Sequence, residues 1–424
     1  MVDRVTDNFD RRGHVTWPQP LGVFPLPAGY LLVVDGDDHD EARLSLLAGV
    51  RPPKFPRALT YYERSLDGDV AGALAELERL DTDDVIVRVN RMVLAPDPAH
   101  LESLIADVTA TDDAGLLAFV ETLAFVVGLR ASPPEVVTVT DEVAAMVYAA
   151  HATTAFERGD SASAIEHLEL AAQAAQTVSR PLAGQLMGQL ANAQLDEGGV
   201  QRASVTFQAA LDAMAGTDLN VSRAELHVAA GAMFQEMSEA APRLMQQAID
   251  HYHQAMALVN AETAPETFAI ANANLGLAYL TMPMHEASDQ LRIGVAVQSM
   301  REALNHFTPE SHPDRWSSTQ LNLANALVYM PSKHQADNIT EAVDLYEQLL
   351  AYRDRGSDPQ GRARVLANQG NALAHLGAFD DAKARLHEAR AIFEEFEDHD
   401  AVMAVRSVLD EVAKHESLIR QDST

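Results

Sequence analysis

Residues 367–389, ANQGNALAHLGAFDDAKARLHEA, contain the pattern that decides the fold. Gly370 is a small residue in the middle of a first segment, and Gly377 separates this segment from a second one. In the second segment, Ala382 and Ala389 flank the bulky Leu386. Small residues let two antiparallel helices approach closely, and a bulky residue fills the groove one turn away. A glycine between the helices supplies the left-handed conformation that ends the first one. The stretch therefore predicts a helix–turn–helix unit.

The same arrangement occurs six times, with intervals of 39, 39, 46, 48 and 46 residues between its small markers. The markers of the six first helices are Ala152, Ala191, Ala230, Gly276, Ala324 and Gly370. Each second helix has an alanine at Ala164, Ala203, Ala248, Ala296, Ala342 or Ala382. A bulky residue follows four positions later, at Leu168, Phe207, Tyr252, Met300, Tyr346 or Leu386. Six units in one phase predict a stack of helix pairs.

These units resemble the tetratricopeptide repeat (TPR), and the resemblance covers residues 140–397. It implies an all-α fold, a right-handed superhelical solenoid of antiparallel helix pairs. Units three to five carry extra residues between their helices, which is similar to an extended bacterial variety of the repeat.

The two ends of the chain have different patterns. Residues 1–134 contain eleven of the 19 prolines, which block helix interiors, so we expect a mixed, mostly helical region there. Gly29-Tyr-Leu-Leu-Val-Val34 predicts a short strand, and residues 57–80 predict a degenerate repeat. We place a domain boundary at Pro133-Pro134. Residues 398–424 predict a capping helix for the last repeat and a frayed tail.

Composition excludes several classes of protein. The formal net charge is −31, so a polyanionic nucleic acid or an anionic membrane surface is repelled. The absence of cysteine excludes disulfides, cysteine-ligated metals and thiol nucleophiles. The polar start of the chain lacks the apolar core of a signal peptide, and Glu121 interrupts the longest apolar run, 114–129. We therefore expect a cytoplasmic protein.

Asparagines recur beside the small markers of the first helices. They lie two positions before a marker or one position after it, which is one helix face. The TPR resemblance implies that this face lines a concave groove that holds a partner segment, because an amide can bond to any peptide backbone. The candidate partner-binding residues are Asn192, Asn274, Asn322, Asn325, Arg364, Asn368 and Asn371. The alternative is that these amides bond between neighbouring helices.

An acidic cluster follows the expected strand. Its candidate metal ligands are Asp35, Asp37, Asp38 and His39, since carboxylates and imidazole bind divalent cations. The spacing matches no calcium loop, and the same residues form an ordinary turn followed by a helix cap. The second interpretation is favoured, so we expect neither a metal nor another cofactor.

The sequence thus favours a non-catalytic scaffold or adaptor that binds an extended segment of a partner protein in the concave groove, with an assembly or maturation accessory factor as the role we expect. The acidity favours a basic partner. No phosphate-binding loop, dinucleotide-binding turn or serine-hydrolase elbow occurs. Two alternatives stay open, a metal-dependent enzyme and a peptide sensor, each with its site in the N-terminal region. Self-association is also left open.

Overall fold

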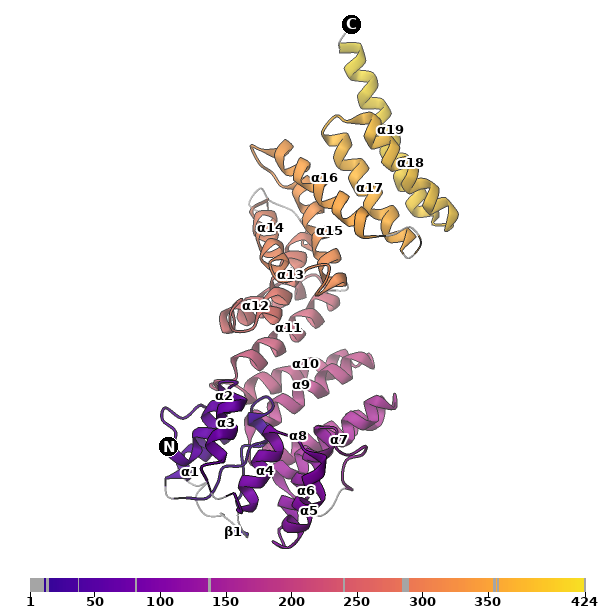
Figure 1. Cartoon of the computed structure of the whole chain (residues 1–424). Helices are drawn as coiled ribbons and strands as arrows, with labels where there is room; N and C mark the ends of the chain where they lie inside the picture. The colour runs from indigo at the N-terminus through magenta and orange to yellow at the C-terminus, as the bar shows by residue number, and fades with distance from the viewer. Residues whose placement is uncertain are drawn as a thin grey trace. The chain divides into compact units, whose positions relative to one another are not determined.

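The computed structural model describes residues 11–12, 15–36, 38–80, 82–135, 139–238, 241–283, 290–353, 356 and 358–422. Apart from one two-stranded hairpin, the regular structure of these residues is helical, which confirms the predicted all-α class (Figure 1). The chain forms two compact units, unit 1 (Met1–Met233) and unit 2 (Phe234–Thr424). Their boundary lies inside a repeat helix, and the division of the chain at Pro133-Pro134 stays a prediction.

Unit 1 begins with short elements. Strand β1 (Arg11–Arg12) pairs antiparallel with β2 (Val15–Thr16). Two 3₁₀ turns and six helices follow: η1 (Ala28–Tyr30), α1 (His39–Leu47), η2 (Arg57–Leu59), α2 (Thr60–Leu66), α3 (Val70–Leu77), α4 (Val85–Leu94), α5 (Pro98–Thr109) and α6 (Ala114–Val126). The carboxylates of Asp84, Asp97 and Asp113 accept N–H groups of the next turn, which fixes where α4, α5 and α6 begin.

The six predicted repeats are six helix pairs. The first helices are α7 (Asp141–Glu157), α9 (Arg180–Asp196), α11 (Asn220–Met237), α13 (Pro265–Thr281), α15 (Pro313–Tyr329) and α17 (Pro359–His375). The second helices are α8 (Ser161–Gln176), α10 (Val200–Ala213), α12 (Leu244–Leu258), α14 (Gln290–Leu304), α16 (Gln335–Tyr352) and α18 (Phe379–Glu395). Helix α19 (His399–Asp422) packs on α18. Consecutive helices pack together from α7 to α10 in unit 1 and from α12 to α19 in unit 2.

The predicted scaffold residues form the contacts between paired helices. The alanines and bulky residues of the second helices are at most 1% exposed in all six repeats. A Cβ on Gly370 would lie 2.7 Å from Cγ of Leu386 and 3.1 Å from the carbonyl oxygen of Ala382. A Cβ on Gly276 would lie 2.8 Å from Cγ of Met300. The two helices of each of these pairs therefore approach so closely that only glycine fits.

The predicted strand at Gly29–Val34 is wrong. Ala28–Tyr30 forms the 3₁₀ turn η1, and the next residues are extended without a partner strand among the described residues. Side chains take the place of a neighbouring strand: Asn90 accepts the N–H of Leu32 through Oδ1 (2.7 Å) and donates to its carbonyl through Nδ2 (2.8 Å). Gln19 makes the same pair of bonds to Val33, at 2.8 and 3.3 Å.

Two further features concern the N-terminal half. Helices α2 and α3 pack against each other at the position of the predicted degenerate repeat, with Ala73 and Leu77 fully buried. The region also bonds to the repeats of unit 1, because Oγ of Ser179 donates to the carbonyl of Leu47 (3.0 Å). Across the described part of the chain, no helix has both the length and the apolar character needed to span a membrane.

The close approach at Gly370 leads to a stability prediction. Gly370→Ala should lower the free energy of unfolding of unit 2 by about 1–2 kcal/mol, because overpacking at Leu386 exceeds the gain in helix propensity. Urea unfolding followed by Trp316 fluorescence, in a Trp17→Phe background, measures the change. The matched control is Gly294→Ala in α14, where a Cβ meets nothing within 4 Å, and it should stabilise by up to about 1 kcal/mol. Equal effects at both glycines would contradict the packing argument.

Candidate functional site

The first helices of unit 2 present a row of polar side chains. Helices α13, α15 and α17 contact one another as well as their second helices. On α15 and α17, side chains spaced 4, 3 and 4 residues apart share one face. We call this surface the α15–α17 stripe; its residues are Ser318, Asn322, Asn325 and Tyr329 on α15, and Arg364, Asn368, Asn371 and His375 on α17. All eight are exposed or half-buried, whereas residues beside them such as Leu323 and Ala324 are buried.

Four of the predicted asparagines bond between helices: Asn325 and Asn368 as follows, and Asn274 and Asn371 as described below. Oδ1 of Asn325 accepts the hydroxyl of Tyr346 (2.6 Å) and Nδ2 of Asn368 (3.0 Å). The bulky residue of the repeat thus joins α15, α16 and α17 through its hydroxyl. Burial raises the pKa of the Tyr346 hydroxyl, so this group stays a neutral donor. The interhelical role that the sequence left as an alternative is therefore observed for Asn325 and Asn368.

A similar arrangement occurs two repeats earlier in unit 2. The hydroxyl of Tyr252 on α12 donates to Oε1 of Gln235 on α11 (2.8 Å) and is also hydrogen-bonded to Asn274 on α13. The corresponding residue between these two repeats is Met300, which has no hydroxyl. Asn322 lies on the first helix of the repeat after Met300, at the position that Asn274 and Asn368 occupy in their repeats. It makes no hydrogen bond to the described residues.

Several polar groups of the stripe stay open. Asn322 and Arg364 have neither a hydrogen bond nor an ion pair with the part of the chain that the structure describes, and the same holds for Asn192 in unit 1. Asn371 donates to the Tyr329 hydroxyl oxygen (3.1 Å). Other arginines nearby are paired, as Arg362 is with Glu388 and Arg385 with Glu347. The stripe therefore offers amides and a guanidinium to another molecule.

The first-helix surface of unit 1 is covered by the chain's own N-terminal segment. Nε2 of Gln185 on α9 donates to the carbonyls of Val23 (2.6 Å) and Gly22 (3.3 Å). Gly22 has a φ of +67°, and a Cβ there would lie 2.8 Å from Leu182 on α9 and 3.0 Å from Met146 on α7. Gln185 and Met146 occupy the repeat position that Arg364 occupies on α17. Turn backbone held by a first-helix amide is thus present within the chain itself.

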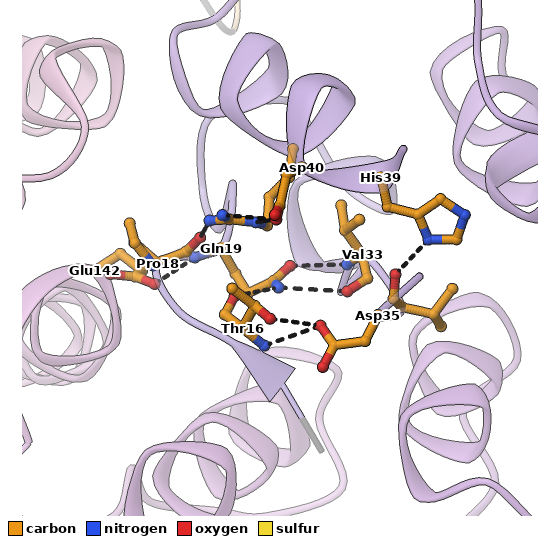
Figure 2. A network of polar contacts seen from close by, with 10 residues as sticks. Thr16, Pro18, Gln19, Val33, Asp35, His39, Asp40 and Glu142 are labelled. Carbon is orange, nitrogen blue, oxygen red and sulfur yellow. Dashed lines mark hydrogen bonds and ion pairs between the residues drawn. The ribbon is translucent and has the colours of Figure 1, made fainter. Parts of the chain in front are cut away.

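A buried polar network anchors this segment to the first repeat (Figure 2). Oε1 of Glu142 on α7 accepts the N–H of Gln19 (2.6 Å), and the buried guanidinium of Arg43 donates to the carbonyl of Pro18. Burial raises the pKa of Glu142 to about 7. Glu142 was missed by sequence reasoning, because nothing in its neighbourhood marks it as buried.

Two of the four candidate metal ligands, Asp35 and His39, have other partners. Oδ1 of Asp35 accepts Oγ1 (2.7 Å) and the backbone N–H (3.2 Å) of Thr16, and Nδ1 of His39 lies 2.7 Å from the carbonyl oxygen of Val34 (Figure 2). Asp38 is exposed at the start of α1, and Asp37 lies outside the described residues. Among the described residues no three histidine, aspartate or glutamate side chains gather as metal ligands would. These groups shape the turn and hold the segment.

Solved structures similar to this chain are TPR proteins. MamA from Desulfovibrio magneticus RS-1 shares 18% identity over 51% of this chain and 97% of its own, with a TM-score of 0.36. YrrB, a TPR protein with an unusual peptide-binding site, shares 14% over 52% of this chain and 91% of its own, with a TM-score of 0.37. A Rap protein complexed with Competence and Sporulation Factor shares 12% identity over 85% of this chain and 97% of its own, with a TM-score of 0.38.

The fold is TPR-like. No family model and no curated protein matches the chain. At these sequence identities the similarity concerns the fold alone, so inferences about function depend on the residues of the first helices. The signal that sequence reasoning missed was the position of Gln185, which shares its register with Arg364.

The buried carboxyl of Glu142 leads to a pH prediction. Its pKa is raised from 4.5 to about 7, so the folded state binds the proton more tightly, and stability is lost as the pH rises between these values. This shift corresponds to about 3 kcal/mol. Glu142→Gln keeps an oxygen for the N–H of Gln19 and should remove this dependence. The measurement is urea unfolding at about pH 4 and pH 8, followed by Trp17 fluorescence in a Trp316→Phe background.

The control for this experiment is Glu157→Gln, at the exposed end of the same helix. It should leave the pH profile of unit 1 as it is in the wild type. A Glu142→Gln profile that runs parallel to the wild type would show that Glu142 ionises alike in the folded and unfolded states.

The Tyr346 hydroxyl leads to a second stability prediction. Tyr346→Phe removes the donor to Asn325 and should lower the free energy of unfolding of unit 2 by about 1 kcal/mol. Tyr352→Phe is the matched control, since this half-exposed tyrosine on the same helix makes no side-chain hydrogen bond within the described residues. Denaturant unfolding of both variants checks the prediction, and a loss no larger for Tyr346 than for Tyr352 would refute it.

Proposed function

We propose that the protein is a non-catalytic binding scaffold that holds an extended segment of a partner protein on the α15–α17 stripe. TPR folds typically bind proteins or peptides, and the stripe lies on the first helices, which contact one another across repeats. The amides of the stripe would bind the backbone of the partner segment, and the two ends of the stripe would contact its side chains.

One observation carries the proposal: in unit 1, side-chain amides already hold the backbone of the N-terminal segment. Gln185 bonds to two successive backbone carbonyls, and Asn90 and Gln19 each bond to both backbone groups of one residue. Such amide-to-backbone bonds do not depend on the sequence of the held segment. The open amide of Asn322 and the Arg364 guanidinium offer the same chemistry in unit 2, where the described chain does not cover them.

The tyrosine hydroxyls prepare the stripe for this task. Because Tyr346 fixes Oδ1 of Asn325, the Nδ2 group of the same amide has a defined direction and makes no hydrogen bond to the described residues. Asn368 donates through Nδ2, which leaves its own oxygen as an acceptor. Amides held in place before binding lose less conformational entropy when a ligand arrives.

The partner we propose is basic. With a net charge of −31, the chain attracts cationic proteins and accelerates their encounter, more so at low salt. We further propose a cytoplasmic accessory role in the assembly or maturation of a larger protein, on the analogy of the fold. No cofactor takes part in this function.

The test separates the open groups of the stripe from amides elsewhere. An Asn322→Ala and Arg364→Gln double variant should lose partner binding by about tenfold or more, because both side chains lack other partners in the described chain and replacing them leaves the repeats intact. The measurement is capture of partners from the cytoplasm of the native host, quantified by mass spectrometry. Unchanged circular dichroism and unfolding midpoint establish that the fold is kept.

The control is a Gln246→Ala and Gln298→Ala double variant. These exposed amides lie on the second helices α12 and α14, where each bonds to a carboxylate one turn away. The control should capture the wild-type partner at the wild-type level. If the stripe variant still captures the partner at the wild-type level, the partner does not bind to the stripe. Capture of further copies of this chain would indicate self-association.

A further inference from the structure

The C-terminal ends of α15 and α17 form an aromatic corner of the stripe. Tyr329 is the last residue of α15 and His375 the last of α17. Their rings lie 6.3 Å apart at an angle of 81°, edge to face. Tyr329 is 61% exposed, and its position is fixed because Asn371 donates to its hydroxyl oxygen. A large ring held in place yet left open is suited to contact another molecule.

The two helix ends give this corner a negative character. Backbone carbonyls at a helix C-terminus carry partial negative charge, and here two such ends lie together. On α17, the N–H of Leu376 bonds to carbonyls of the last turn. After Tyr329 the chain leaves α15 in an extended conformation at Met330, and within the described residues no following backbone N–H caps that last turn. Of the last four residues of α15, Ala326, Leu327 and Val328 are buried and Tyr329 is exposed, so the carbonyl oxygen of Tyr329 is the acceptor that a ligand would reach.

We propose that this corner receives an arginine side chain of the partner segment, and this inference rests on the function proposed above. The guanidinium stacks on the Tyr329 ring and donates an N–H group to the carbonyl oxygen of Tyr329, which no described backbone N–H caps. A flat cation with several donors fits both features, whereas an ammonium presents a compact, strongly hydrated charge. The net charge of −31 favours a cationic group over an anionic one.

Arg364 lies far enough from the corner to leave this cation undisturbed. It is eleven residues before His375 on α17, a rise of about 16 Å along the helix. Charges at that separation are largely screened at physiological ionic strength. The stripe thus has a cationic side chain at one end and a cation-accepting corner at the other.

The experiment measures arginine selectivity directly with the full-length protein. Pools of short fluorescent peptides carry random flanks around one fixed residue: arginine, lysine, citrulline or leucine. Citrulline has the shape of arginine without its charge. Wild type should bind the arginine pool at least about threefold more tightly than the citrulline pool, as a cation stacked on an aromatic ring predicts. Tyr329→Leu should bring this ratio to about one, and Tyr329→Phe should keep most of it because the ring remains.

Tyr352→Leu is the matched control, since Tyr352 is also the last residue of its helix and is 44% exposed, but it lies on the second helix α16. It should keep the wild-type ratio. Asn322→Ala should weaken all pools equally, because it removes a contact to the peptide backbone.

The outcomes separate the two proposals. Equal binding of arginine and citrulline pools that is still weakened by Asn322→Ala overturns the arginine corner alone. Lysine binding as tight as arginine binding overturns the assignment to a guanidinium. Arginine selectivity that persists in Tyr329→Leu places the cation elsewhere. The absence of binding to any pool overturns both the corner and the scaffold function on which it rests.

Discussion

The close approach of paired helices at the small markers is the constraint on which the rest of the structure depends. At Gly370 and Gly276 the space for a methyl group is taken by the bulky residue of the second helix and by a backbone carbonyl. The closely packed pairs stack on one another, and the first helices of successive repeats, α13 with α15 and α15 with α17, are in contact. That stacking brings the polar faces of α15 and α17 side by side, and without it no stripe would exist.

The bulky residue of each second helix has a second use where it is a tyrosine. Tyr252 and Tyr346 fill the groove with their rings and orient amides on adjoining first helices with their hydroxyls. Packing and hydrogen bonding are thus joined in one side chain, as buried polar groups require. A substitution that removes either tyrosine ring would therefore loosen the core and also release the amides that its hydroxyl orients.

The sequence predicted the repeats because their pattern is local: small and bulky residues at helical spacing are visible without knowledge of the partner. The sequence pattern predicted that Asn325 and Asn368 share one surface. It did not predict the hydrogen bonds of Asn325 to Tyr346 and to Asn368, because these bonds join residues 21 and 43 positions apart. The apolar run ending at Val34 has the composition of a strand, and its true backbone partner is the side chain of Asn90, 58 residues away. Partners that distant leave no periodic trace in the sequence.

The anchoring of the N-terminal segment has a consequence for the order of folding. Gln19 bonds to Glu142, and Val23 to Gln185, across 123 and 162 residues of chain. During synthesis this segment leaves the ribosome well before its partners, whereas each repeat closes through contacts with its neighbours in sequence. We therefore expect the repeats of unit 1 to form before the segment docks, so that Gln19 and Val23 reach their final place after residues that are made later.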